Sequence, residues 1–291
     1  MSTPEPVRPT VGRRQLGAEL NRLRTAKGIK LKDVAEYLGT SPTRAGRLES
    51  GRGRVMPKAE EIRKLCALYD VTDERQIQRL IEMLPAPKQP GWWDPYRELL
   101  PSGLEVFLEL ETNALDERAW EPVLVHGLLQ TPEYARAVIE TGPTNRQTDV
   151  EDLVEARTKR RELLTSARVG RDPLALWVIL DEAVIRRPIG GPTVMRGQLE
   201  HLIVMAALPS VTLQIVPQAK GAHPGLGGAF SLLEFEDEPP IAYVDCPAGN
   251  LYLEKKTEVR RFTTTFDLLR AVAHDPLESA AILHSAAKEM K

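Results

Sequence analysis

The first part of the chain is patterned as a series of short helices. Leu16, Leu20 and Leu23 recur at i, i+4 and i+7, so they share one face of a helix that ends at Gly28. Apolar residues at similar spacing predict four further helices, separated by glycines and prolines. Their expected ranges are 31–38, 41–50, 57–68 and 73–84. The pattern therefore predicts a mainly α domain of five compact helices.

The remainder of the chain mixes helical patterns with short apolar runs. Helices are expected over 104–120, 131–140, 150–165, 194–208, 258–274 and 276–290. Runs rich in aliphatic and aromatic residues, bounded by Gly, Pro or Asp, predict strands over 174–180, 211–216, 230–235, 241–245 and 251–254. The last three strands are close enough in sequence to form an antiparallel meander. We therefore expect a larger α+β domain with a mixed or antiparallel sheet.

A proline-rich segment separates the two patterns. Five prolines fall within residues 85–101, a density that forbids a continuous helix and favours an extended connection. Trp92 and Trp93 interrupt this segment, and a free linker would not normally expose two indoles, so we expect it to dock on a domain. The expected organisation is a disordered arm over 1–12, a helical domain over 13–84, a docked linker over 85–103 and an α+β domain over 104–291.

Composition excludes several classes of protein. The chain of 291 residues is 42% hydrophobic and 27% charged, which is typical of a soluble globular protein and not of a disordered one. Its longest apolar runs have seven residues, far fewer than the roughly 20 that a membrane helix needs. No signal peptide is recognised, so a cytoplasmic protein is expected. Cys66 and Cys246 are too few for a disulfide scaffold or a cysteine-based zinc site.

Charge is distributed unevenly along the chain. Residues 1–58 hold 13 Lys and Arg against 5 Asp and Glu, whereas the whole chain has a net charge of −2. A basic head therefore precedes an acidic body. Such a division is expected when one small domain meets a polyanion and the other does not.

The predicted helices over 31–38 and 41–50 have the spacing of a helix-turn-helix. A single helix fits the major groove of DNA when its first turn presents polar side chains and its other face packs on the preceding helices. Here Ala45 and Leu48 would face inward. The predicted base contacts are Pro42, Thr43, Arg44 and Arg47. The predicted phosphate contacts are Arg13, Arg14, Ser41, Arg52 and Arg54.

Three segments of this region carry a family resemblance. Residues 24–29 (RTAKGI), 33–39 (DVAEYLG) and 47–51 (RLESG) resemble the xenobiotic-response-element type of helix-turn-helix, the phage-repressor-like family. The resemblance implies a structural ion pair between Arg24 and Glu49. Its contact positions carry over to Leu31, Pro42, Thr43 and Arg47. The family usually has Gln at position 31 and often at position 42, so specificity is expected to rest on Thr43, Arg44 and Arg47.

The rest of the chain, over about 92–287, carries a second resemblance. The segments 110–111 (LE), 126–136 (HGLLQTPEYAR), 157–161 (RTKRR) and 180–183 (LDEA) are similar to the C-terminal domain of WhiJ-like regulators of actinomycetes. His126 replaces the expected proline. The resemblance implies a regulator of development or specialised metabolism, often encoded beside a small partner protein and sometimes described as antitoxin-like. It implies no ligand and no catalytic residue.

Three functional interpretations remain open. The first is a homodimeric, nucleoid-associated regulator that binds an inverted repeat in double-stranded DNA and receives a signal, which a small-molecule effector could supply. The second is an antitoxin-like module whose C-terminal domain chiefly binds a small partner protein. The third is a hydrolase built from His223, Asp245, Cys246 and Glu254, but the chain lacks the usual hydrolase motifs. We therefore expect no enzyme, cofactor or metal.

Six residues are candidates for an effector site or an interface: Trp92, Trp93, Asp181, Glu182, Arg186 and Arg187. The tryptophans are most simply packing residues, with an aromatic-lined effector pocket as the alternative. The four charged residues are better interpreted as a buried or subunit-crossing ion-pair cluster than as a ligand pocket.

Overall fold

The computed structural model divides the chain into two compact units, Met1–Gly91 and Trp92–Lys291. It describes residues 10–50, 57–84, 91–101, 103–142, 147–168, 171–236, 238–246 and 250–290. For residues 10–15, 47, 50, 147 and 148 it describes the backbone alone. The arm predicted over 1–12 lies outside the described residues up to residue 9, but residues 10–12 are helical, so that part of the prediction is wrong. Residues 85–90 of the proline-rich stretch also lie outside the described residues.

The N-terminal unit is a bundle of short helices, as the sequence predicts. They are α1 (Thr10–Ala26), α2 (Leu31–Tyr37), α3 (Pro42–Ser50), α4 (Ala59–Leu68) and α5 (Glu74–Glu82). Each helix contributes to one core, which includes Leu16, Leu20, Val34, Ala45, Ile62, Leu65, Tyr69 and Leu80. Gly28 and Gly39 follow α1 and α2 with φ of +67° and +64°, a left-handed conformation that favours glycine and ends each helix.

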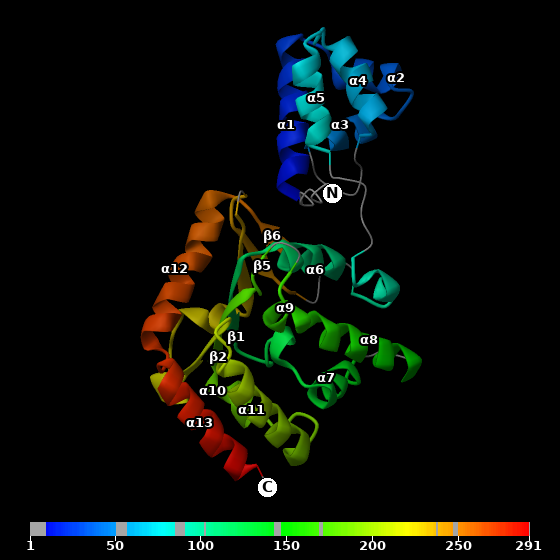
Figure 1. The fold of residues 1–291 in the computed structure, drawn as a ribbon. Coiled ribbons are helices and arrows are strands. Elements are labelled where there is room, and N and C mark those ends of the chain that lie inside the picture. The colour runs from blue at the N-terminus through cyan, green and yellow to red at the C-terminus, as the bar shows by residue number, and fades with distance from the viewer. Residues whose placement is uncertain are drawn as a thin grey trace. The chain divides into compact units, whose positions relative to one another are not determined.

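The C-terminal unit contains a six-stranded mixed sheet (Figure 1). The strands are β1 (Asp116–Glu121), β2 (Ala175–Asp181), β3 (Val211–Val216), β4 (Phe230–Glu234), β5 (Ile241–Val244) and β6 (Leu251–Leu253). Their order is β3-β2-β1-β4-β5-β6. The pairs β1–β2 and β2–β3 are parallel, whereas β4 runs antiparallel to both β1 and β5, and β5 to β6. This confirms the predicted α+β class and the predicted meander of the last three strands.

Helices cover both faces of this sheet (Figure 1). They are α6 (Leu104–Asn113), α7 (Pro132–Ile139), α8 (Gln147–Arg160), α9 (Glu162–Thr165), α10 (Glu182–Arg186), α11 (Pro192–Ala206), α12 (Lys256–Val272) and α13 (Pro276–Glu289). Short 3₁₀ turns are η1 (Asp94–Tyr96), η2 (Gly127–Leu129), η3 (Gln218–Lys220) and η4 (Pro224–Gly227). Successive side chains of a strand point to opposite faces of the sheet. Trp120 and Ile179 therefore pack with α12 on one face. Ala119 and Val178 pack with α6, α11 and α13 on the other face.

Two predicted helices differ from the structure. The helix expected over 104–120 ends at Asn113, and the chain continues into β1, which lies between β2 and β4 in the sheet. The sequence DERAWE of β1 holds three charged residues before its apolar pair, so its local pattern does not suggest a strand. It becomes one because strands distant in sequence pair with it on both sides. The helix expected over 150–165 is divided into α8 and α9 at Arg161.

The segment before α6 packs on the C-terminal unit. The Trp92 indole Nε1 donates to Thr112 Oγ1 in α6 at 3.3 Å, and the two indole rings meet edge to face with centroids 5.6 Å apart. Trp93 is only 8% exposed. These contacts give both tryptophans a packing role. Among the described residues, no helix is long and apolar enough to cross a membrane.

Candidate functional site

The turn between α2 and α3 is fixed by local hydrogen bonds. The Thr40 backbone N–H donates to the Ala35 carbonyl at 2.8 Å, which closes the end of α2. Ser41 Oγ accepts from the Arg44 backbone N–H at 3.2 Å and so caps α3. Pro42 occupies the first position of α3, where a missing N–H costs nothing. The sequence Ser41-Pro42 thus sets where α3 begins.

The helix α3 presents different chemistry on its two faces. Ala45 and Leu48 are 1% and 3% exposed and pack on the core, whereas Pro42 and Thr43 are exposed. Arg47 belongs to α3, but its side chain lies outside the described residues. The side chains of Arg13 and Arg14 lie outside them as well, and so do Arg52 and Arg54 entirely.

Arg44 has a partner that the sequence did not suggest. Its Nη1 lies 2.8 Å from Glu61 Oε1 in α4, and its Nη2 donates to Glu61 Oε2 at 3.3 Å. The hydrogen bond to Glu61 raises the pKa of Arg44 above its usual value. This side chain is therefore engaged within the unit.

A buried ion pair joins α1 to the end of α3. Arg24 Nε donates to both carboxylate oxygens of Glu49, at 2.7 and 2.9 Å. Asn21 Nδ2 also donates to Glu49, at 2.9 Å, and the Tyr69 hydroxyl donates at 3.4 Å. Arg24 Nη1 donates to the Ile29 carbonyl at 2.7 Å, which ties the same side chain to the loop before α2. The pair therefore fixes the orientation of α3 on α1.

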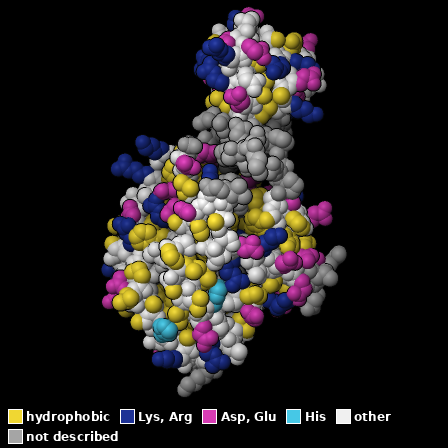
Figure 2. Space-filling model, in the orientation of Figure 1, with side chains coloured by type: hydrophobic (Ala, Val, Ile, Leu, Met, Phe, Trp, Pro, Cys, Tyr) yellow, Lys and Arg dark blue, Asp and Glu magenta, His cyan; other side chains and the backbone are white. Residues whose placement is uncertain are grey.

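Basic and acidic side chains are mixed on the face of the N-terminal unit that Figure 2 shows. Exposed ion pairs such as Lys27–Asp70, at 2.8 Å, contribute to this mixture. The geometry of α3 and its turn therefore distinguishes this surface more clearly than its charge does.

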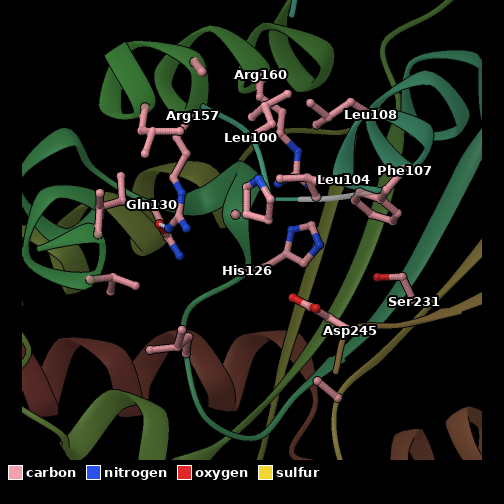
Figure 3. Close-up of a pocket in the computed structure, with 18 of the residues that line it drawn as sticks. Leu100, Leu104, Phe107, Leu108, His126, Gln130, Arg157, Arg160, Ser231 and Asp245 are labelled. Carbon is pink, nitrogen blue, oxygen red and sulfur yellow. Dashed lines mark hydrogen bonds between the residues drawn. The ribbon is translucent and has the colours of Figure 1, made fainter. Parts of the chain in front are cut away.

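The C-terminal unit contains a cavity of about 540 Å³ that is open to solvent (Figure 3). Apolar side chains from α6, α7 and α8 form much of its wall, among them Leu104, Phe107, Val138, Ile139 and Leu153. The polar lining comes from the end of β1 and the segment after it, from α8 and from the residue after β5, and includes Glu121, His126, Gln130, Arg157, Arg160 and Asp245. A volume of this size is typical of small-molecule sites.

A buried ionic cluster adjoins this cavity, and two of its members, Arg160 and His126, line it. Arg160 makes a two-pronged contact with Glu111 in α6, with its Nε donating to Oε2 at 2.5 Å and its Nη2 donating to Oε1. His126 Nε2 lies 3.2 Å from Glu117 Oε1 in β1. Both carboxylates are fully buried. Four ionisable side chains from four separate segments therefore meet inside the unit.

The charges in this cluster shift one another's pKa values. Burial opposes charge on His126, but the neighbouring Glu117 carboxylate outweighs it and raises the pKa of the imidazole. Burial would raise the pKa of Glu117, but the charge and hydrogen bond of His126 lower it overall. Burial raises the pKa of Glu121 to about 7, although His126 favours its charged form. The Glu117–His126 pair is thus a salt bridge, beside a carboxyl that titrates near neutrality.

Three members of this cluster lie close enough together to hold a metal ion. Ligand atoms of Glu111, Glu117 and His126 all lie within 4.8 Å of one another. However, Arg160 occupies both oxygens of Glu111 and already supplies the positive charge that a metal would bring. The residues present therefore fit an internal ion-pair network better than a metal centre.

Comparison with known protein families identifies both units. A helix-turn-helix domain matches residues 15–80, and a domain of unknown function (DUF5753) matches residues 104–285. The chain belongs to the DUF5753 family. No curated protein and no solved structure matches the chain. The helix-turn-helix match identifies the N-terminal unit as a domain of the DNA-binding type.

Four predicted residues lie away from the cavity of the DUF5753 domain. Asp181 caps α10 by accepting from the Ala183 N–H at 2.8 Å. Arg186 lies 3.2 Å from Glu182 and 2.5 Å from Glu289, and Arg187 is exposed. The buried alternative for this ion-pair cluster is therefore wrong: the Arg186 and Glu289 side chains are 39% and 63% exposed, because α10 and α13 meet at the surface. The subunit-crossing alternative stays a prediction. Of the two candidate tryptophans, Trp92 lines the cavity.

The candidates for a hydrolase in the DUF5753 domain have separate surroundings. His223 Nε2 lies 3.6 Å from Asp181, and its ring meets Trp120 edge to face. Its Nδ1 accepts from the Gly225 N–H at 3.2 Å. Asp245 instead lines the cavity. His223 thus has a structural role in the η4 turn.

The ionic cluster of the DUF5753 domain was missed at the level of sequence. Its members are scattered, and one of them, Glu117, lies on the strand that was expected to be helical. A signal was nevertheless present, since Glu111, His126 and Arg160 fall in the segments that carry the C-terminal resemblance.

Proposed function

We propose that the protein is a sequence-specific DNA-binding transcription regulator whose helix α3 enters the major groove. The observation that carries the proposal is the amphipathic geometry of α3: Ala45 and Leu48 are buried while Pro42 and Thr43 are exposed at its first turn. The Arg24–Glu49 pair holds the helix in that orientation. Such an arrangement leaves the N-terminal residues of α3 available to base edges.

Individual residues around α3 take different roles in the proposed contact with DNA. Thr43 and Arg47 read bases, and Pro42 contributes apolar contact such as that with a thymine methyl. Arg44 reads a base only where DNA displaces Glu61, because that carboxylate holds its guanidinium. Phosphate contacts come from Arg13, Arg14, Ser41, Arg52 and Arg54, which supply cations and a hydroxyl around the helix.

The proposal includes a homodimer on an inverted repeat, acting on the nucleoid. One α3 covers only a few base pairs, so a dimer gains specificity by placing two copies about one helical turn apart. The DUF5753 unit would serve dimerisation and signal reception by binding and not by catalysis. The antitoxin-like alternative assigns the same unit to a small partner protein.

Selection from a randomised duplex pool with the full-length protein tests this proposal. We expect the selection to enrich an inverted repeat whose half-sites lie about one helical turn apart. The mass of the protein–DNA complex should correspond to two protein chains on one duplex. Arg47→Ala should lose the enrichment. Arg63→Ala, which removes one exposed charge from α4, is the matched control and should keep it. Failure to enrich any sequence with the unmodified protein would contradict the proposal, and a complex that needs a second protein would favour the antitoxin-like alternative.

A further inference from the structure

Two arginines one turn apart on α8 line the cavity, and their surroundings differ. Arg160 is neutralised by the two-pronged contact with Glu111. Arg157 donates from Nη1 to Gln130 Oε1 at 2.6 Å. Among the residues that the structure describes, no carboxylate forms an ion pair with Arg157. One of the two cations is therefore left without a counter-charge.

The acceptor that Arg157 does have is neutral and fixed. Gln130 is 5% exposed, and its Nε2 donates to the Val125 carbonyl at 2.8 Å, which orients its Oε1 toward Arg157. The Arg157 guanidinium has five N–H groups, so one amide oxygen leaves most of its donors without a partner in the described part of the protein. Figure 3 shows its guanidinium turned toward Gln130 at the cavity wall.

An uncompensated cation in such surroundings is energetically unfavourable. Burial disfavours the charge and Arg160 repels it, so the pKa of Arg157 is lowered to about 10. The group is still charged at neutral pH. A buried charge normally has a paired partner, because its desolvation is otherwise uncompensated. The missing partner is expected to come from outside the chain.

The apolar part of the cavity wall indicates what accompanies that negative charge. Leu104 and Phe107 of α6 line it together with Val138 and Ile139 of α7 and Leu153 of α8. Leu153 precedes Arg157 by one turn of α8, so an apolar surface adjoins the guanidinium directly. A bare inorganic ion would leave this apolar surface uncovered.

We propose that this cavity binds a small organic anion, with its acidic group on Arg157 and its apolar body against α6, α7 and α8. Arg157 is the anion-binding residue, and Gln130 is a positioning residue that orients the guanidinium. The inference goes beyond the proposed function, because the cavity belongs to the C-terminal unit and its occupancy is measured without DNA.

Two fluorescent probes with the same apolar body test the proposal on the full-length protein. Anilinonaphthalene sulfonate carries an acidic group, and N-phenylnaphthylamine does not. Saturable binding of the sulfonate at one site is expected, with displacement by phenylbutyrate and not by phenylbutyramide. Arg157→Met should weaken sulfonate binding by about tenfold to a hundredfold, the change expected for losing a charge-assisted hydrogen bond. Binding of the neutral probe should change less than about twofold.

A structural role for Arg157 would give a different result. Arg157→Met should leave the melting temperature unchanged or raise it, since it removes an unpaired buried charge, and Arg157→Lys should restore part of the sulfonate affinity. Arg136→Met, on the surface of α7, is the matched control and should bind both probes with unchanged affinity.

A second pair of variants supplies the counter-charge from within the chain. Leu153→Glu places a carboxylate one turn from Arg157, so this variant should bind the sulfonate probe more weakly than Leu153→Gln does. The two variants should bind the neutral probe with equal affinity. Equal sulfonate affinity in the Glu and Gln variants, unchanged affinity in Arg157→Met, or no saturable binding to the unmodified protein would overturn the proposal.

Discussion

Arg24 Nε contacts both carboxylate oxygens of Glu49, at 2.7 and 2.9 Å, and so connects the first helix of the N-terminal unit to the end of α3. The two side chains are only 14% and 4% exposed, so water screens the pair poorly. Removing one partner of a buried pair leaves the other charge uncompensated. The orientation of α3 thus depends on an interaction inside the N-terminal unit.

Arg24→Met is therefore expected to destabilise the N-terminal unit by about 3 to 5 kcal/mol, the usual cost of breaking a buried ion pair. Amide hydrogen exchange in the full-length protein checks this. Exchange is expected to become faster in α1 and α3 and to stay the same in the C-terminal unit. Arg22→Met is the control: Arg22 pairs with Glu19 at an exposed site and should cost less than about 1 kcal/mol. Equal exchange in both variants would show that the pair has no structural role.

The contact between Arg44 and Glu61 predicts a gain of DNA affinity. Glu61→Gln frees the arginine and removes a negative charge near α3, so binding is expected to tighten by up to about fivefold, given that a partly exposed pair is worth up to about 1 kcal/mol. Glu60→Gln, the neighbouring residue paired with Lys64, removes the same charge without freeing Arg44. Equal affinities of the two variants for one duplex would contradict a role for Arg44.

Gly225 is expected to tolerate no side chain. A Cβ at this position would lie 2.6 Å from Trp120 Cε2, and the Trp120 Nε1 donates to the Gly225 carbonyl at 2.8 Å. Because Trp120 is fully buried, Gly225→Ala should destabilise the C-terminal unit by about 1 to 3 kcal/mol through overpacking. Gly227→Ala meets no atom within 4 Å and serves as the control. Urea unfolding of the two variants distinguishes them, and equal midpoints would be inconsistent with the packing described.

Glu121 makes stability depend on pH. Its pKa is about 7 in the folded chain against 4.5 as the ordinary value, so between these pH values the folded state keeps a proton that the unfolded state has lost. The free energy of unfolding therefore falls as pH rises from about 4.5 to about 7. The raised pKa of His126 acts in the same direction above its ordinary value.

Glu121→Gln should remove its share of this pH dependence. The share is at most about 3 kcal/mol, because each pKa unit corresponds to about 1.4 kcal/mol. Urea titrations of the variant and the unmodified protein at pH 5 and pH 8 measure it. If the variant loses as much stability between pH 5 and pH 8 as the unmodified protein does, groups other than Glu121 cause the pH dependence.

Local sequence predicts the fold where local interactions dominate. The helices of the N-terminal unit have apolar spacing, glycine stops and the Ser41-Pro42 start, all within a few residues of one another. The strand β1 could not be predicted in this way, because its pairing partners lie about 60 and 115 residues further along the chain. The predicted base contacts followed from one helix, whereas Glu111, His126 and Arg160 are brought together only by tertiary packing.

Arg47 is central to the proposed function, and its effect on specificity is expected to be separable from that of phosphate contacts. Arg47→Ala should cost about 1 to 3 kcal/mol on the selected duplex and little on a scrambled one. Arg54→Ala should weaken both duplexes alike and reduce the salt slope by about one.

Anisotropy titrations of the full-length protein with the selected and scrambled duplexes, from about 50 to 200 mM salt, measure this most directly. The account predicts that the logarithm of the affinity falls linearly with the logarithm of the salt concentration. It also predicts that Arg47→Ala loses affinity for the selected duplex and not for the scrambled one. The absence of salt-dependent binding to any duplex, or an equal loss on both, would contradict it.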